Sequence, residues 1–419
     1  MKYIVRITDS GPLSFRTGRE TTSGETLKYV SGSVLFGALA TTYAKLRHDD
    51  TVAFNEIFFS DESSFGNLYP SSFSHAGLGR DSDAVYPLPN TASTCKRFGG
   101  FRFDFDEDDS DDPHHGVYDT LIPWALFVLG DQSHFEVFKD VDKCHFKLFK
   151  DVDKCTICEA SMDRMDGFYR RNARDAQKMG TASIKRALRT RTGINRATGT
   201  VQQGILYSRE VLRPGMEFWG TVSVPDAQDK SFKQFVEQAN QSGMLRLGNN
   251  KTRGFGRVTL RLKAAKERGE LDSLRQRLQT FDAELRQAAQ NFDIETPHKL
   301  YLPLTLTADA ILFDRLLRYR TALDRAYLES LGILGAELIY QNSATRRVMG
   351  WNTLLGVPKA DEIAITMGSV FLFGLASELN DNLLQRLLRI QTEGIGARRR
   401  EGFGRLLLAS RFHWEVKGR

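Results

Sequence analysis

The sequence predicts an α+β protein that contains two copies of one small domain, and a repeated glycine-rich segment is the main reason. Residues 248–258 (GNNKTRGFGRV) recur in altered form as residues 396–406 (GARRREGFGRL). Each copy follows a predicted helix, at 230–239 and 381–390, and each runs into a segment that alternates apolar and polar residues. The same order of helix, glycine loop and strand at two places indicates a duplicated domain.

The two glycine loops have the composition of a phosphate-binding segment. Glycines allow a positive φ and leave room for an approaching polymer. The exposed backbone N–H groups, with Arg and Lys between them, can then contact phosphates. We therefore predict that both loops contact a nucleic-acid backbone; the alternative is a tight turn with exposed charges. The predicted contact residues are Gly248, Lys251, Arg253, Gly254, Gly256 and Arg257 in the first loop and Gly396, Arg398, Arg399, Arg400, Gly402, Gly404 and Arg405 in the second.

Length and composition are those of a multidomain globular protein. A chain of 419 residues exceeds one ordinary core and predicts two or three domains, and 41% hydrophobic residues exclude a disordered chain. No apolar run approaches the roughly 20 residues that span a bilayer. The N-terminal residues predict a strand rather than a signal peptide, so we expect a cytoplasmic protein. Its four cysteines are then expected to be reduced and available for a metal.

Positive charge is concentrated in one part of the first half. The net charge is +6, but residues 164–196 contain ten Lys and Arg against two Asp. A dense basic segment together with basic glycine loops indicates a polyanionic partner. The acidic run at 104–112 lacks the spacing of a metal site and is interpreted as a solvated loop.

The densest part of this basic segment is a second candidate for RNA contact. Single-stranded RNA is held by cations together with stacking aromatic side chains, and Phe168, Tyr169 and Tyr207 are available for stacking. Asn195 and Thr192 could hydrogen-bond bases or sugars. The alternative is a solvated basic loop. The predicted contact residues are Lys185, Arg186, Arg189, Arg191, Asn195 and Arg196.

The first half is expected to contain a small sheet with a long insertion. Residues 60–113 are rich in Ser, Gly, Pro and Asp and are expected to carry few elements. Residues 134–155 contain an 11-residue tandem duplication, interpreted as a surface insertion because lengthening a loop costs little entropy. The predicted elements are strands at 3–7, 54–59, 204–212, 216–224 and 256–262, and helices beginning at 32 and at 120–129 and 230–239.

A long amphipathic helix is predicted between the two halves at 267–289. Its apolar residues recur at spacings of three and four, which places them on one face. They are Leu271, Leu274, Leu278, Phe281 and Leu285. The second half then has predicted strands at 299–306, 363–373 and 404–409, and predicted helices at 308–317, onward to 338, and at 381–390.

Each half therefore has the order strand, helix, strands, helix, strand, which favours two ferredoxin-like domains. The predicted boundaries are an N-terminal domain at 1–263 with an insertion at about 60–200, a helical linker at 264–297 and a C-terminal domain at 298–419.

At this point the sequence resembles the RAMP superfamily of CRISPR-associated proteins, whose ferredoxin-like domains carry a glycine-rich loop between the second helix and the last strand. Within it, the chain is most similar to the Csx-ten (Cas-five-like) subunits of type III-D effector complexes. The resemblance covers nearly the whole chain, and the duplicated segment at 134–155 departs from it. The similar stretches are residues 32–39, 87–97, 115–121, 155–169, 192–200 and 350–359.

The resemblance implies a subunit of a multi-protein, RNA-guided complex of antiviral defence. Such a subunit holds the repeat-derived 5′ end of the crRNA and caps the backbone of RAMP subunits. Its implied partners are crRNA, the other effector subunits including the large subunit, and target RNA through the complex.

Two cysteines at close spacing predict half of a metal site. Cys155-x-x-Cys158 has the spacing of two ligands of tetrahedral zinc. The resemblance implies that Cys95 and His115 complete a structural Cys3His zinc site. Cys144 and His114 stay open as substitutes, and the alternative reading is reduced free thiols.

No catalytic residue is predicted. General acid–base cleavage of RNA needs a positioned side chain near the scissile phosphate, and the spacing of the histidines indicates no partner for them. RAMP relatives include ribonucleases, so a metal-independent endoribonuclease that processes precursor crRNA is the competing function. A zinc-stabilised structural protein without RNA is the third.

Overall fold

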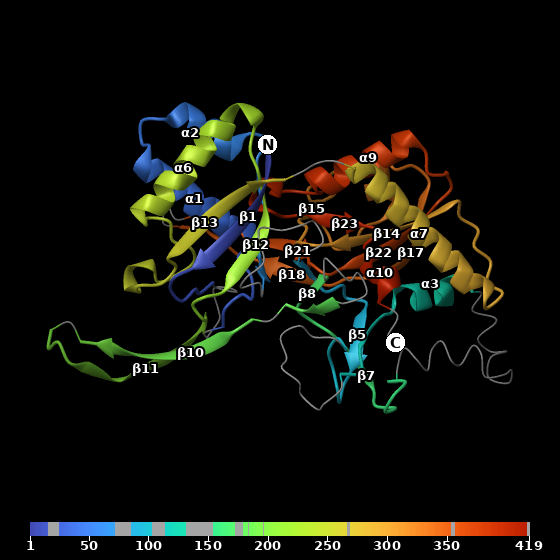
Figure 1. Cartoon of the computed structure of the whole chain (residues 1–419), viewed down its shortest axis with the longest axis horizontal. Helices are drawn as coiled ribbons and strands as arrows, with labels where there is room; N and C mark the ends of the chain where they lie inside the picture. The colour runs from blue at the N-terminus through green and yellow to red at the C-terminus, as the bar shows by residue number, and fades with distance from the viewer. Residues whose placement is uncertain are drawn as a thin grey trace.

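The computed structural model describes residues 1–15, 25–71, 85–102, 114–130, 154–171, 179–182, 184–195, 197–265, 269–352 and 357–416. The acidic run at 104–112, most of the duplicated segment at 134–155, and Arg196 lie outside the described residues. The fold is a mixture of helices and several antiparallel sheets (Figure 1). We call the part before helix α7 (Glu270–Gln290) the first half and the part after it the second half.

The first half is built on an antiparallel sheet with one buried face. β1 (Lys2–Asp9) alternates half-buried and buried residues, as its apolar–polar sequence predicts. It pairs with β12 (Glu217–Ser223) and β13 (Val258–Ala264), giving the order β13-β1-β12-β2, and β3 also pairs with β12. β2 (Ser64–Phe65) and β3 (Tyr69–Ser71) complete the sheet. The helices α1 (Gly32–Leu46), α2 (Thr51–Phe59) and α6 (Asp229–Ser242) pack their apolar faces into the same core.

The second half contains a four-stranded antiparallel sheet with the order β17-β22-β14-β23. β14 (Leu300–Leu306) and β22 (Val370–Leu375) are buried along their whole length because α7 and α9 (Asp381–Glu393) share one core with them. β17 (Ala336–Asn342) and β23 (Leu406–Leu408) form the edges. Numbered along the chain, the strands of both sheets lie in the order fourth, first, third, second, so the two halves share one topology.

Smaller elements connect and decorate these sheets. Figure 1 shows β10 and β11 projecting from the body as a long two-stranded arm. We call residues 186–212, which form this hairpin, the arm. The elements are β4 (Val85–Pro87), β5 (Ala92–Cys95), β6 (Val117–Asp119), α3 (Leu121–Leu129), β7 (Met162–Arg164), β8 (Phe168–Arg171), β9 (Met179–Thr181), β10 (Arg186–Ile194), β11 (Val201–Leu212), η2 (Asp226–Gln228), β15 (Leu312–Phe313), β16 (Tyr319–Arg320), α8 (Arg325–Ser330), β18 (Thr345–Val348), β19 (Trp351–Asn352), β20 (Val357–Pro358), β21 (Glu362–Ile365) and α10 (Phe412–Glu415).

The predicted connecting helix at 267–289 is confirmed as α7. Leu274, Leu278, Phe281 and Leu285 are fully buried, as their spacing predicts. Among the helices that the structure describes, none combines the length and the hydropathy that a bilayer-spanning helix needs.

Several predicted elements are wrong. Residues 54–59 form part of helix α2 rather than a strand, because Phe54, Ile57 and Phe58 lie on one helical face and Asp50 caps the helix by accepting the N–H of Ala53 at 3.2 Å. The described part of 60–113 also carries strands β2 to β5, of which β2 and β3 belong to the first sheet.

The predicted helices between 308 and 338 are also mostly wrong, since only α8 is helical there. Asp314 accepts the N–H groups of Leu316 and Arg318 at 2.8 and 2.9 Å, which closes a turn between β15 and β16. The single strand predicted at 363–373 is two strands in different sheets, β21 and β22. They separate at Gly368, which has a φ of +86°.

The two glycine loops have one backbone conformation. We call residues 248–256 loop 1 and residues 394–404 loop 2. Each contains a short 3-10 turn, η3 (Lys251–Arg253) in loop 1 and η4 (Arg399–Glu401) in loop 2. The same four offsets have a positive φ in both loops, namely Gly248, Asn250, Gly254 and Gly256 and their counterparts Gly396, Arg398, Gly402 and Gly404.

The loops differ in what they contact. A Cβ on Gly402 would approach the carbonyl oxygen of Phe65, in the first half, to 2.6 Å. A Cβ on the equivalent Gly254 would meet nothing within 4 Å. Loop 2 is therefore packed against the backbone of the first half, whereas loop 1 is open at the same position.

This difference predicts unequal costs for one substitution. Gly254→Ala should lower the free energy of unfolding by roughly 1–2 kcal/mol, since only left-handed strain is added. Gly402→Ala should lower it further, because the same strain is joined by a clash with backbone that cannot move aside cheaply. Chemical denaturation of both variants is the measurement, and equal losses would contradict the packing of loop 2.

Candidate nucleic-acid interface and metal centre

The base of the arm brings four arginines together beside loop 1. In the β10–β11 ladder, Arg189 pairs with Arg209 and Arg191 pairs with Tyr207, so these side chains share one face of the ribbon. Arg253 of loop 1 donates from Nη1 to the Tyr207 hydroxyl at 3.0 Å. Three segments of chain therefore contribute to one cluster, which we call the arginine cluster: Arg189, Arg191, Arg209 and Arg253.

Phe255 of loop 1 packs its ring against two arginines of this cluster. Its ring is buried, with 2% of the residue exposed. The guanidinium carbons of Arg191 and Arg189 lie 4.6 and 5.9 Å from the ring centroid, within the range of a cation–π interaction. The ring holds the two arginines in place without removing their charge.

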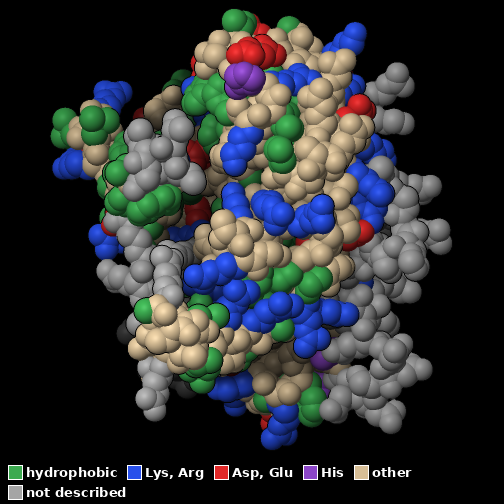
Figure 2. Space-filling model, turned by 90° about the vertical axis from the view of Figure 1, so that its left-hand side faces the viewer, with side chains coloured by type: hydrophobic (Ala, Val, Ile, Leu, Met, Phe, Trp, Pro, Cys, Tyr) green, Lys and Arg blue, Asp and Glu red, His purple; other side chains and the backbone are tan. Residues whose placement is uncertain are grey.

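The part of the chain that the structure describes places no carboxylate against the arginine cluster. Among the described residues, no Asp or Glu lies within ion-pair distance of Arg189, Arg191, Arg209 or Arg253. Figure 2 shows the side of the molecule that lies at the left in Figure 1, where the arm projects. Lys and Arg side chains form a broad band across this face. Four cations held together without carboxylates repel one another, and a bound polyanion would relieve that repulsion.

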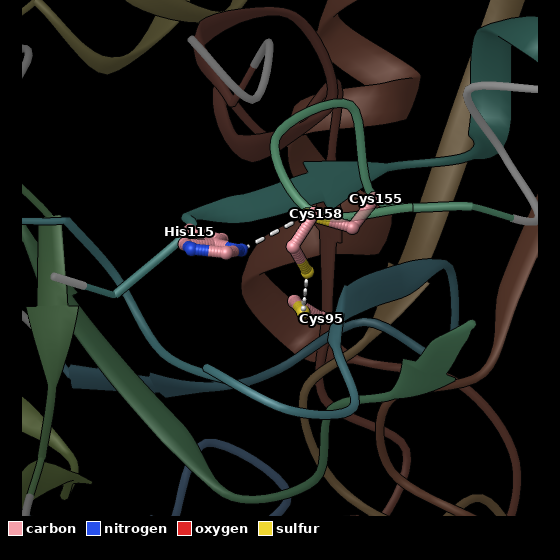
Figure 3. A group of neighbouring side chains, drawn as sticks. All are labelled: Cys95, His115, Cys155 and Cys158. Atoms are coloured by element: carbon pink, nitrogen blue, oxygen red, sulfur yellow. Dashed lines mark hydrogen bonds between the residues drawn. The ribbon is translucent and has the colours of Figure 1, made fainter. Parts of the chain in front are cut away.

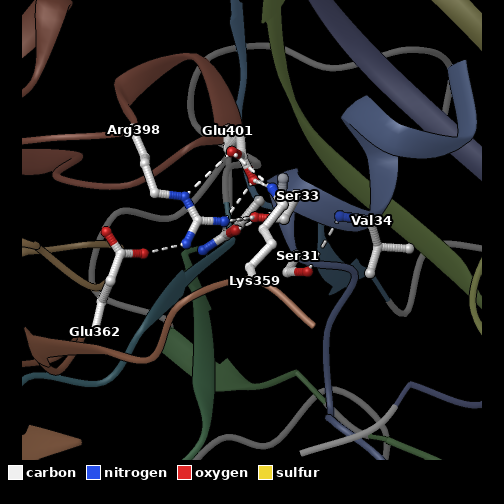
Figure 4. A network of polar contacts seen from close by, with 9 residues as sticks. Ser31, Ser33, Val34, Lys359, Glu362, Arg398 and Glu401 are labelled. Atoms are coloured by element: carbon white, nitrogen blue, oxygen red, sulfur yellow. Dashed lines mark hydrogen bonds and ion pairs between the residues drawn. The ribbon is translucent and has the colours of Figure 1, made fainter. Parts of the chain in front are cut away.

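Loop 2 carries three arginines, and each of them is paired with a carboxylate of the chain. Figure 4 shows Arg398 between Glu362 and Glu401, and its Nη2 lies 2.6 Å from Glu401 Oε2. Arg399 lies 3.5 Å from Glu393, and Arg400 lies 3.0 Å from Asp61 of the first half.

Burial shifts the pKa values in loop 2. Desolvation opposes the charge of Arg398, but Glu401 and Glu362 outweigh it and raise the pKa of the guanidinium. Arg405 is more deeply buried, donates to the Thr392 carbonyl and the Ser64 hydroxyl, and has its pKa lowered to about 10, mainly by desolvation. The role of loop 2 in phosphate contact stays a prediction, with these intramolecular contacts as competitors.

The other predicted contact residues lie in varied settings. Arg186 is paired with Glu210 at 2.8 Å, and Lys185 is exposed at the base of the arm. Asn195 accepts the N–H of Ala197 at 2.9 Å, so its side chain shapes the turn at the tip of the arm. Arg257 is exposed just after loop 1.

The predicted stacking residues divide into two kinds. Phe168 and Tyr169 are 2% and 5% exposed and belong to the core, so the prediction that these two rings stack on RNA is wrong. Tyr207 is exposed within the arginine cluster.

Both loops border one groove of about 2060 Å³. The α1–α2 side contributes apolar residues, including Val34, Phe36 and Phe59. Lys251 of loop 1 and Lys45 of α1 also line it, and burial together with the charge of Lys45 lowers the pKa of Lys251. Lys45 and Lys251 have no carboxylate partner among the described residues. They extend the positive charge of the arginine cluster into the groove.

The sheet β6-β5-β7 carries a group of four potential metal ligands (Figure 3). Cys95 ends β5, His115 precedes β6, and Cys155 and Cys158 lie on the turn before β7. Their ligand atoms all lie within 4.8 Å of one another. The structure therefore brings together the four residues that the sequence combined, whereas Cys144 lies outside the described residues.

The geometry of this group fits a tetrahedral ion. Cys95 Sγ and Cys158 Sγ are 3.5 Å apart, and His115 Nδ1 is 3.1 Å from Cys155 Sγ. Bonds of about 2.0–2.3 Å to one ion would separate such ligands by about 3.5–3.8 Å. Burial opposes ionisation of Cys95, but the N–H groups of Phe98 and Arg97 and the neighbouring thiols outweigh it and lower its pKa, which favours the thiolate that a metal binds. The group can hold a metal as a structural crosslink between three strands.

Of the described histidines outside this group, His413 has structural surroundings. His413 is buried between Asp119 Oδ2, at 2.9 Å from its Nδ1, and Thr305 Oγ1, at 2.7 Å from its Nε2. This contact ties β6 to β14 through α10. With 3% of the residue exposed, His413 is out of reach of a phosphate.

Comparison with known proteins identifies the family. The family model of the RAMP superfamily matches residues 11–259, so the chain belongs to the RAMP superfamily, as its sequence resemblance predicted. No curated protein sequence matches the chain.

Two solved structures can be compared with the chain. It is similar to a chain in the cryo-EM structure of the type III-B Cmr-beta bound to cognate target RNA, at 13% identity and a TM-score of 0.38, covering 93% of this chain and 94% of that one. It is also similar to a chain in the crystal structure of the Csm3-Csm4 subcomplex in the type III-A CRISPR-Cas interference complex, at 12% identity and a TM-score of 0.36, covering 91% and 96%.

The metal group predicts a matched pair of histidine variants. Purified protein should contain about one metal ion per chain. His115→Ala, or Cys155→Ser with Cys158→Ser, should release it and destabilise the protein, because metal binding is coupled to folding. His114→Ala is the control and should keep the metal. Elemental analysis of protein purified without chelator decides: metal lost from His114→Ala but kept in His115→Ala would exchange the two assignments, and no metal in the unaltered protein would refute the site.

Proposed function

We propose that the protein is a non-catalytic, crRNA-binding subunit of a type III CRISPR effector complex. The arginine cluster carries this proposal, because four cations lie together without a carboxylate partner among the described residues, and two of them, Arg189 and Arg191, pack on the buried ring of Phe255. Such a surface suits phosphates, whose contacts dominate the affinity of RNA-binding proteins. Membership of the RAMP superfamily supports RNA as the polyanion.

We further propose the Csx-ten-like subunit of a III-D-like complex as the closest role. It would hold the repeat-derived 5′ end of the guide and cap the RAMP backbone in the cytoplasm, with the other effector subunits and target RNA as its partners. The order of the six similar stretches in the sequence supports this choice. The shared strand order of the two sheets supports ferredoxin-like domains at 1–263 and 298–419, connected by a helical linker at 264–297.

Three kinds of contact are proposed for the guide. Arg189, Arg191 and Arg253 would contact phosphates at the base of the arm, and Lys251 would extend that path into the groove. Tyr207 would supply the stacking surface that single-stranded RNA needs between such cations. Asn195, at the arm tip, would lie nearer the 5′ end and contribute to preference for the repeat-derived sequence.

The metal is proposed to be zinc with a structural role. Three thiolates and one imidazole are a typical zinc ligand set, and a filled shell leaves no position for a catalytic water. When bound, the ion would hold β5, β6 and β7 together.

This proposal predicts different effects for two arginines. Arg191→Ala should weaken binding to every RNA sequence and reduce the slope of log affinity against log salt by about one unit, because one phosphate contact is lost. Arg325→Ala, the matched control from α8, removes an arginine paired with Glu329 at 2.8 Å and lying outside the groove lining, and should leave the slope almost unchanged. Affinities at several salt concentrations, with repeat-derived and unrelated RNA, provide the measurement. The proposal fails if Arg191→Ala keeps the slope of the unaltered protein.

A further inference from the structure

An exposed tryptophan lies on the second-half side of the groove. Trp351 is 58% exposed, whereas Trp219 and Trp414 are each 8% exposed, and Trp124 stacks on Tyr340. Exposing so large a ring forfeits the stabilisation that its burial would give, so the position calls for an explanation. Trp351 belongs to the lining of the groove.

Backbone pairing fixes the position of Trp351 at the groove. Trp351 lies on β19 and pairs with Pro358 of β20, and Lys359 donates its N–H to the Gly350 carbonyl at 2.9 Å. The ammonium group of the same Lys359 lies 3.2 Å from a carboxylate oxygen of Glu401 (Figure 4). Pairing of β19 with β20 therefore places Trp351 at the groove. The neighbouring cation, Lys359, is already paired with Glu401.

Trp351 and the lysines that lack a carboxylate partner among the described residues lie on different sides of the groove. On the second-half side, Arg346 and Arg347 are paired with Asp309 and Asp361, and loop 2 is paired as described above. On the first-half side, Lys45 and Lys251 have no carboxylate partner among the described residues. A polyanion in this groove would place its charge toward the first half and leave its uncharged parts facing Trp351.

We propose that Trp351 stacks on a base of single-stranded RNA in the groove, with the backbone phosphates of that strand turned toward Lys45 and Lys251. This inference rests on the proposed RNA-binding function and adds the orientation of the strand. Cations on one side and an aromatic face on the other match the way single strands are held. A duplex keeps its base faces stacked inside and cannot offer one to Trp351.

The test uses the full chain with a short oligouridine and with an RNA duplex of equal length. Oligouridine should quench the tryptophan fluorescence of the unaltered protein, since Trp351 is the most exposed tryptophan among the described residues. The duplex should not. Trp351→Leu should lose the quenching and bind oligouridine about 5- to 150-fold more weakly, the range for one base–aromatic stack. Its salt slope should stay unchanged because stacking releases no counterions.

Two further variants separate the outcomes. Trp351→Phe keeps an aromatic face and should retain most of the affinity, whereas Leu334→Ala removes a 72%-exposed apolar side chain away from the groove lining and should have no effect. Unchanged oligouridine affinity in Trp351→Leu, while Arg191→Ala weakens binding, would overturn the stacking role and leave the proposed function standing. Absence of RNA binding by the unaltered protein would instead refute the proposed function. Loss of a co-purifying protein subunit from Trp351→Leu, with RNA affinity intact, would assign the ring to a protein contact and overturn the inference.

Discussion

The packing of loop 2 against the first half is the contact on which the rest of the arrangement depends. Gly402 lies against the backbone at Phe65, Arg400 reaches Asp61, and Arg405 donates to Ser64. These contacts join sequence positions more than 300 residues apart and set the spacing between the two halves. The groove exists because loop 1 and loop 2 end up on its two sides, each at the end of its own sheet.

Charge pairing follows from this packing. A cation that is withdrawn from water needs a partner to remain favourable, and removing one member of a buried pair is costly. Arg398 satisfies this need through Glu362 and Glu401, and its position at the junction explains why two carboxylates converge on it. Loop 1 has no such packing at Gly254, so Arg253 stays exposed, and only partial desolvation acts on Lys251, lowering its pKa. The same motif therefore serves the junction at one site and an open surface at the other.

The sequence was sufficient for features that depend on local spacing. The loop repeat, the amphipathic face of α7 and the combination of Cys155 and Cys158 with Cys95 and His115 were all predicted, although the last two ligands came from family resemblance. The charge pairing of loop 2 was only partly predictable, because Asp61 and Glu362 reach it through the tertiary fold, whereas Glu393 and Glu401 are close in sequence. Phe168 and Tyr169 were misjudged for a related reason: an aromatic residue in a basic segment gives no local sign of burial. Residues 308–338 were misassigned because an apolar run favours a helix until a side chain such as Asp314 closes a turn.

Phe255 and Phe403 occupy the same position in the two loops, but each supports an arginine from a different segment. Phe255 lies 4.6 Å below the guanidinium of Arg191, and Phe403 lies 4.7 Å from that of Arg398. In loop 2 the arginine is Arg398 of the loop itself, and it forms ion pairs with two carboxylates. In loop 1 the arginine comes from the arm, and the ring fixes it without neutralising it. An aromatic face is therefore the shared anchor. Arg398 is paired with carboxylates and joins parts of the protein, whereas Arg191 has no carboxylate partner among the described residues and is free to make the phosphate contact proposed above.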